Sequence, residues 1–321
     1  MDATAFRLLN GYQRDFPLVP RPFSEIGAGA ELPEDEVIRI FERLRDEGKL
    51  SRIGAVFRPN TVGASALAAL AVPGPDLARV ARIVSGQPEV NHNYEREHRY
   101  NLWFVVTAGS EAGVRAAIDR IESECGLKAL RLPLEEEFHI DLGFDLADGS
   151  VPRATRDSPG KIPLNEDAAR LLAALADGLP IAKDPYRQLG LKADLSEGQV
   201  IATLRGWIDG GIVRRFGAVV RHRPLGYRAN AMAVWDVPDG EVRDAGARLA
   251  ALAPVTLCYR RARQLPDWPY NLFCMIHGRE RGAVQRAVAE VARAAGLEGY
   301  PRETLFSTRC FAQRGARYAH G

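Results

Sequence analysis

Two stretches of the chain place an aromatic ring and a guanidinium on alternate residues, and one of them adds an imidazole. The first stretch contains His92, Tyr94 and Arg96, and the second contains Tyr259 and Arg261. In a β-strand, alternate side chains lie on the same face of the sheet, so each stretch predicts a row of side chains on one surface. Aromatic rings can support a flat ligand, and the planar, permanently charged fork of arginine binds carboxylates. The rows therefore indicate a site for a ligand that is both apolar and rich in carboxylates.

Histidine is the residue that most readily exchanges protons near neutral pH. Four of the six histidines lie in strand-like or basic stretches where they could donate a proton: His92, His139, His222 and His277. Asp141 follows His139 by two residues, and an aspartate placed there can fix the tautomer of a histidine and raise its pKa. The same aspartate could instead cap a turn, and each histidine could instead serve a hydrogen bond within the fold.

A further group of arginines lies at the two ends of two short stretches of nearly the same sequence, RIGAVFR and RFGAVVR. Four of them are candidates for holding the carboxylates of a ligand: Arg52, Arg58, Arg215 and Arg221. A solvated surface position explains any single arginine equally well. The group as a whole is therefore a better indication of a site than its members are.

Composition excludes several classes of protein. The chain has 43 Lys and Arg against 41 Asp and Glu, a net charge of only +2, which is not the charge of a strong nucleic-acid binder. No apolar stretch approaches the roughly 20 residues that span a bilayer, and the first residues lack a basic leader. The four cysteines are scattered without metal-ligand spacing, which argues against a disulfide framework or a zinc site. We expect a cytoplasmic protein that has no metal site of its own and does not contact membranes.

The chain is a tandem duplication. Leu8-Leu9 corresponds to Leu171-Leu172, and RIGAVFR corresponds to RFGAVVR. Further along, after a short insertion around LPDW, the string Tyr-Asn-Leu at 100–102 returns at 270–272. A repeat of this length predicts one architecture built twice.

The first part of each copy has the pattern of three helices followed by strand-like sequence. In the second copy, Ser196 and Gln199 have the spacing of a capping box at the start of a helix. Val200 and Leu204 then fall on one helical face, and Gly210 and Gly211 end the helix. Three helices closed by a two-stranded wing describe a winged helix-turn-helix domain in each copy.

The second part of each copy alternates strands and helices in the order βαββαβ, which is ferredoxin-like. We expect the two sheets to face each other, as the subunits of a dimer would. The predicted class is α+β, with these segments: winged helix-turn-helix domains at 1–65 and 164–228, ferredoxin-like domains at 66–146 and 229–321, and a linker rich in Pro, Gly and charge at 147–163.

The helices of the first domain do not suit DNA. The helix that would read bases opens with Glu34, Asp35 and Glu36, and these carboxylates would repel the phosphate backbone. They suit the positive end of a helix dipole instead. We therefore predict no DNA partner despite the helix-turn-helix pattern.

The order of domains resembles that of Lrp/AsnC regulators, repeated twice over nearly the whole chain. The strings HNYERE, YNLWF and EEFHIDLGFDL in the first copy resemble one subunit type of siroheme decarboxylase. In the second copy, FGAVVRH, LGYRANAMAVW and WPYNLFCMIHG resemble the other type. The chain thus resembles a fused siroheme decarboxylase.

That resemblance implies the removal of CO2 from two acetate side chains of siroheme, giving 12,18-didecarboxysiroheme for haem d1 or an alternative haem route. The macrocycle can accept the electron density that CO2 leaves behind, so no cofactor is expected and iron enters only within the substrate. A histidine would supply the proton or ligate the iron, and arginines would hold the carboxylates. An Lrp/AsnC-type transcription regulator and a noncatalytic tetrapyrrole-binding protein remain the alternatives, and the sequence leaves open whether the chain forms a homo-oligomer.

Overall fold

The computed structural model describes residues 1–59, 61–140, 143, 145–147 and 165–318, and these form two compact units. Nearly all of the predicted linker, residues 148–163, lies outside the described residues. Each unit takes residues from both copies of the repeat. The helical unit comprises Met1–Gly63, Arg153–Leu225 and Arg317–Gly321, and the barrel unit comprises Ala64–Pro152 and Gly226–Ala316.

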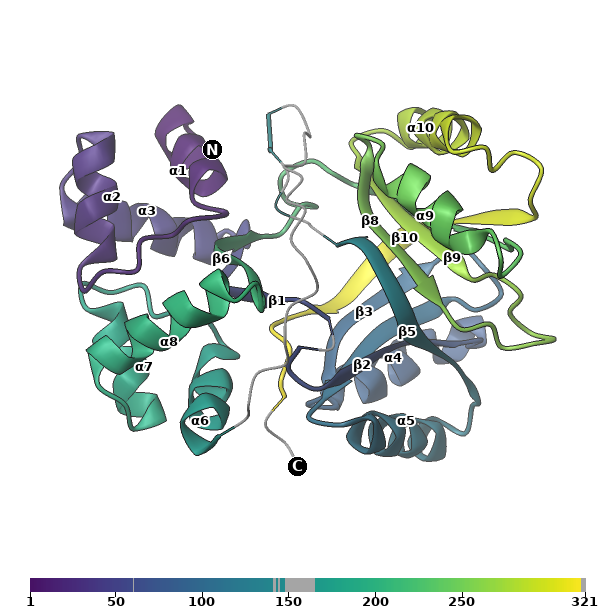
Figure 1. The fold of residues 1–321 in the computed structure, drawn as a ribbon, viewed down its shortest axis with the longest axis horizontal. Coiled ribbons are helices and arrows are strands. Elements are labelled where there is room, and N and C mark those ends of the chain that lie inside the picture. Colours follow the sequence, from purple (N-terminus) through teal and green to yellow (C-terminus); the bar gives the residue numbers. More distant parts are fainter. Residues whose placement is uncertain (60, 141–142, 144, 148–164, 319–321) are drawn as a thin grey trace. The chain divides into compact units, whose positions relative to one another are not determined.

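The helical unit contains three helices from each copy (Figure 1). They are α1 (Ala3–Gly11), α2 (Pro22–Ala30), α3 (Glu34–Asp46), α6 (Glu166–Leu175), α7 (Pro185–Ala193) and α8 (Glu197–Asp209). The predicted capping box opens α8: the Gln199 N–H donates to Ser196 Oγ, and the Ser196 N–H donates to Gln199 Oε1 at 2.9 Å. Val200 and Leu204 are fully buried, so the apolar face of this helix was predicted correctly.

The two copies share a single β-ribbon in this unit. Strands β1 (Leu50–Phe57) and β6 (Val213–Val220) pair antiparallel, with Gly54 opposite Gly217. This differs from the two-stranded wing expected within each copy, because each copy contributes one strand. The two near-identical stretches satisfy each other's backbone hydrogen bonds. A Cβ on Gly217 would come within 2.4 Å of the Tyr12 carbonyl oxygen, which explains the glycine at this position.

The barrel unit contains two ferredoxin-like βαββαβ arrangements, as predicted. In the first copy the strands lie in the order β3-β4-β2-β5, and in the second copy in the equivalent order β8-β9-β7-β10. The first copy supplies β2 (Ala64–Leu70), the 3-10 turn η1 (Gly74–Asp76), α4 (Leu77–Gly86), β3 (Val90–Arg96), β4 (Leu102–Ala108), α5 (Glu111–Cys125) and β5 (Ala129–Ile140). The second supplies β7 (Ala229–Trp235), α9 (Val242–Ala250), β8 (Val255–Arg261), β9 (Leu272–Gly278), α10 (Arg281–Ala294) and β10 (Arg302–Gln313).

The two sheets join edge to edge into a closed eight-stranded barrel. The last strand of each copy pairs with the second strand of the other, β5 with β8 and β10 with β3; Figure 1 shows β10 running beside β3. Closure removes the exposed strand edges that an open sheet would leave. We expected the sheets only to face each other, and the continuous barrel is the difference that the structure adds.

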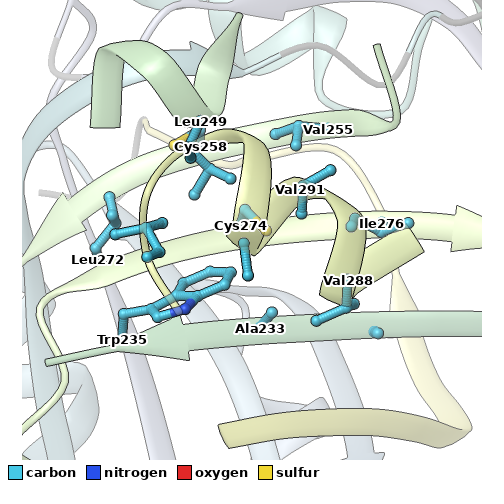
Figure 2. Packing of buried hydrophobic residues seen from close by; sticks show 14 of the residues in the cluster. Ala233, Trp235, Leu249, Val255, Cys258, Leu272, Cys274, Ile276, Val288 and Val291 are labelled. Carbon is cyan, nitrogen blue, oxygen red and sulfur yellow. The ribbon is translucent and has the colours of Figure 1, made fainter. Parts of the chain in front are cut away.

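Both faces of each sheet carry a cluster of buried hydrophobic residues. On the outside, α9 and α10 cover the sheet of the second copy, and Figure 2 shows Trp235, Cys274 and Val288 packed in that layer. A corresponding layer lies under α4 and α5 in the first copy. The interior has its own cluster, in which the rings of Trp103 and Trp268 lie 5.0 Å apart. Among the described residues, no helix combines the length and apolar character needed to cross a bilayer.

A candidate active site on the inner face of the barrel

The residues predicted on one face of β3 do share that face. The rings of His92 and Tyr94 stack with centroids 6.1 Å apart, and the Arg96 guanidinium lies 5.9 Å from the Tyr94 ring centroid. Asn93, between them, points the other way and donates to the Ala81 carbonyl of α4. His92, Tyr94 and Arg96 therefore face the barrel interior, whereas Asn93 faces the helices.

Arg96 is held by the second copy of the repeat. Its Nη1 donates to the Leu305 carbonyl oxygen at 3.1 Å, and its Nη2 lies 3.7 Å from Met275 Sδ. The residue is only 7% exposed. A guanidinium from the first copy is thus placed inside the barrel against strands of the second.

Tyr259 and Arg261 repeat this arrangement in the second copy. Arg261 lies 4.6 Å from the Tyr259 ring centroid, and its Nη1 donates to the Leu132 carbonyl oxygen at 2.8 Å. Leu132 and Leu305 occupy the same position in the last strand of their copies, each on the inner face. Burial lowers the pKa of Arg261. Each copy therefore anchors one inner arginine on the backbone of the other.

Polar side chains continue from Arg96 across neighbouring strands at one level of the barrel. Ser307 of β10 lies opposite Arg96, and Asn230 of β7 lies opposite His277 of β9. Each stands two residues from a residue of the interior cluster, so each faces inward. With Thr256 of β8 they form what we call the first row: Arg96, Ser307, Asn230, His277 and Thr256.

The equivalent positions of the duplicated barrel form the second row. Its members are Arg261, Leu134, Ser65, Thr107 and Asn91. Leu134 lies opposite Arg261, and Ser65 lies opposite Thr107, as in the first row. The second row therefore has the arginine but has threonine where the first row has His277.

His277 has a defined environment within the first row. Its Nδ1 lies 2.9 Å from Thr256 Oγ1, on the neighbouring strand. Burial, and after it the positive charge of Arg96, lower the pKa of His277 to about 4. This imidazole is therefore neutral near neutral pH.

His139 lies in the barrel unit but in neither row. It is on β5 opposite Cys258 and is 9% exposed. Cys258 belongs to the core under α9 and α10. Asp141, predicted to fix the tautomer of His139, lies outside the described residues.

The remaining predicted residues lie in the helical unit, so the structure does not place them in either row: His222, Arg52, Arg58, Arg215 and Arg221. His222 is 8% exposed and follows β6. The backbone N–H of exposed Arg221 donates to the Lys49 carbonyl oxygen at 2.8 Å.

Two of these arginines have structural surroundings of their own. Arg215 is buried, and its Nη1 donates to the carbonyl oxygens of Gln13 at 2.7 Å and Ala218 at 3.2 Å. Arg52 packs against Gly178, and burial lowers its pKa. Arg215 thus has backbone partners within the helical unit, and its contact with a ligand stays a prediction.

Arg58 belongs to a cluster of positive charge. Burial, followed by the charges of Arg58 and Arg14, lowers the pKa of Arg214 to about 10. These three guanidinium groups therefore lie near one another within the helical unit.

Sequence reasoning missed Thr256, Ser307 and Asn230. Ser307 and Asn230 each stand two residues from an inner leucine or methionine, so alternation along the strand could have found them. Thr256 could not be found in this way, because a register shift between Val255 and Leu257 interrupts the alternation. Among the described residues, no group of three or more His, Cys, Asp or Glu is placed to hold a metal ion.

Two family models match the chain, each of them twice. The siroheme decarboxylase NirDL-like HTH domain matches residues 6–50 and 169–214. The AsnC-like ligand binding domain matches residues 62–139 and 224–312. The duplication predicted from the sequence is thus recovered in both parts of each copy.

Whole proteins match over the same range. The chain is 46% identical to the siroheme decarboxylase NirDL subunit of Paracoccus denitrificans (strain Pd 1222), over 99% of this chain and 98% of the relative. The crystal structure of the siroheme decarboxylase NirDL superposes with a TM-score of 0.69 at 27% identity, covering 98% of this chain and 94% of that chain. A co-complex of NirDL with an iron-uroporphyrin III analogue gives a TM-score of 0.68 at 26% identity, covering 99% and 94%. The chain belongs to the siroheme decarboxylase NirDL family.

Proposed function

We propose that this chain is a siroheme decarboxylase that removes CO2 from two acetate side chains of siroheme and yields 12,18-didecarboxysiroheme. The observation that carries the proposal is the 46% identity to a NirDL subunit over 99% of the chain. The co-complex of a structural relative with an iron-uroporphyrin III analogue supports an iron tetrapyrrole as the ligand class.

The first row supplies what this chemistry needs from the protein. Each step converts an acetate into a methyl group: the C–C bond to the carboxylate breaks, CO2 leaves, and one proton joins the methylene carbon. The conjugated macrocycle holds the electron pair between these events, so we propose no cofactor beyond the iron in the substrate. Arg96 would pair with a carboxylate, and a buried site would weaken the hydration of the departing group.

The proton would come from a histidine on the inner face. His92 and His277 both lie there, His92 stacked on Tyr94 and His277 in the first row. Of the two rows only the first contains a histidine, so we assign the proton to His277, with His92, which belongs to neither row, as the other inner-face candidate. Tyr94 and Tyr259 stay predicted supports for the macrocycle, and Arg261 stays a predicted carboxylate contact. The same prediction stays for four arginines of the helical unit: Arg52, Arg58, Arg215 and Arg221.

The acidic start of α3 supports the proposal that DNA is not a partner. Glu34 accepts from Arg21 Nε at 2.9 Å, and Asp35 pairs with Lys183 Nζ at 2.8 Å. These carboxylates thus have cationic partners within the helical unit, so Arg21 and Lys183 are already paired where a recognition helix would offer donors to phosphates. A gel shift with random DNA at low salt should show no complex.

The direct test is anaerobic incubation of the purified protein with siroheme, followed by the mass of the product. Loss of two CO2 units without added cofactor is the expected result. Tight spectral binding without loss of mass would overturn the proposal in favour of a tetrapyrrole carrier. Where CO2 is lost, alanine variants of four histidines would rank the proton donors: His92, His139, His222 and His277. We expect the largest loss of decarboxylase activity from a histidine of the barrel unit.

A further inference from the structure

The hydrogen bond between Thr256 and His277 depends on an irregularity in strand β8. The register of β8 against β9 shifts between Val255 and Leu257. Val255 belongs to the core under α9 and α10, whereas Leu257 packs on the interior cluster. The extra residue between them, Thr256, is 4% exposed and directs its hydroxyl toward β9. A bulge of this kind re-aims one side chain of a strand.

The two contacts of the Thr256 hydroxyl determine the tautomer of His277. Oγ1 lies 3.0 Å from the Met275 carbonyl oxygen and 2.9 Å from His277 Nδ1. A hydroxyl has one hydrogen, and a carbonyl oxygen can only accept. Both bonds form when Oγ1 donates to Met275 and accepts from Nδ1. The neutral imidazole then carries its hydrogen on Nδ1 and its lone pair on Nε2.

The charge of Arg96, which would pair with a substrate carboxylate, also affects His277. Arg96 Nη2 contacts Met275 Sδ, and Met275 stands two residues before His277 on the inner face. The positive charge of Arg96 disfavours imidazolium, after the larger effect of burial. A substrate carboxylate paired with Arg96 would offset that charge and favour protonation of the neighbouring imidazole.

We propose that Thr256 is a positioning residue of the decarboxylase, which holds His277 as the Nδ1–H tautomer so that Nε2 takes up and delivers the proton. The inference rests on the proposed function. On substrate binding, Nε2 accepts one proton from solvent. After CO2 has left, Nε2–H transfers that proton to the methylene carbon, and the neutral Nδ1–H imidazole returns. Each cycle thus consumes one proton and releases one CO2.

Thr256→Val removes the hydroxyl and keeps the shape of the side chain. We expect kcat to fall about 10–100-fold, by analogy with the loss of a hydrogen-bond partner that orients a metal-ligating histidine, with KM unchanged. Thr256→Ser keeps the hydroxyl and should retain most of the activity. Thr107→Val makes the same change in the second row and is the matched control, for which wild-type kcat is expected.

The tautomer can be measured without substrate. Nitrogen-15 NMR of histidine-labelled protein, with His277→Gln used for assignment, should show His277 protonated at Nδ1 in the wild type and a mixture of tautomers in Thr256→Val. A wild-type His277 protonated at Nε2, or unchanged kcat in a folded Thr256→Val, would overturn the inference. Absence of decarboxylation by the wild type would instead reject the proposed function, and the NMR result would still decide the hydrogen bond.

Discussion

The two rows inside the barrel have the same backbone frame and different chemistry. In both, an arginine from one copy donates to a leucine carbonyl of the other, Arg96 to Leu305 and Arg261 to Leu132. In both, a tyrosine lies two residues before the arginine. The rows differ at the positions further along, where the first has His277 and Ser307 and the second has Thr107 and Leu134.

This difference separates a structural role, which the arginines of both rows have, from the catalytic role that we assign to the first row. Anchoring the last strand of the other copy needs only a buried guanidinium, and both rows provide it. Proton transfer needs an imidazole with a defined tautomer, and only the first row has one, bonded to Thr256. The closed barrel therefore needs two anchors, whereas the proposed reaction needs one catalytic row.

The largest expected effect comes from His277→Gln. Glutamine keeps a polar side chain beside Thr256 but cannot transfer a proton, so kcat should fall by about 10²–10⁴-fold, the range for loss of a general acid or base. Siroheme turnover followed by product mass measures the change. Wild-type kcat in this variant would remove His277 from the chemistry and leave His92 as the inner-face donor.

The rows should also differ in how pH affects stability. The pKa of His277 is about 4 in the folded chain, below its ordinary value of 6.5, so between these values the unfolded chain binds more protons. The fold therefore loses stability as the pH falls from about 6.5 to about 4, by up to about 3 kcal/mol. Thr107 does not titrate, so the second row contributes nothing in this window.

Urea unfolding at pH 4, 5, 6 and 7 measures that loss. His277→Gln should remove its part of the pH dependence and leave the contribution of the other groups. Equal slopes for the two proteins would show that His277 titrates alike when folded and unfolded, which contradicts its buried environment.

Much of the fold follows from local sequence patterns. The βαββαβ order comes from alternating periodicity, and the start of α8 comes from Ser196 and Gln199. Barrel closure could not be predicted in this way, because the pairing of β5 with β8 joins residues far apart in the sequence. The same holds for β1 and β6, whose near-identical sequences gave no sign that each pairs with the other.

The inner-face arrangement of His92, Tyr94 and Arg96 was predictable because strand alternation fixes which side chains share a face. Combining His277 with Arg96 required the barrel, since the two residues come from different copies. Thr256 could not be predicted from strand alternation, because the register shift in β8 interrupts it. The backbone carbonyls that Arg215 bonds within the helical unit could not be predicted either, because Gln13 lies far from it in the sequence.

The smallest expected effect separates the two inner arginines. Arg96→Met and Arg261→Met each remove a donor from a buried carbonyl, so each should cost about 1–3 kcal/mol of stability. If the first row alone holds the reacting acetate, only Arg96→Met should also raise KM for siroheme, by about tenfold or 1.4 kcal/mol. Thermal unfolding and steady-state kinetics on the same preparations measure both quantities.

The pair of variants is its own control, because both substitutions remove the same side chain from equivalent frames. Equal losses of stability with unequal KM would support one catalytic row on a symmetric scaffold. An equal rise in KM for Arg261→Met would mean that both rows hold carboxylates of one substrate. The macrocycle would then lie across the barrel interior, and the second row would be a binding surface rather than only an anchor.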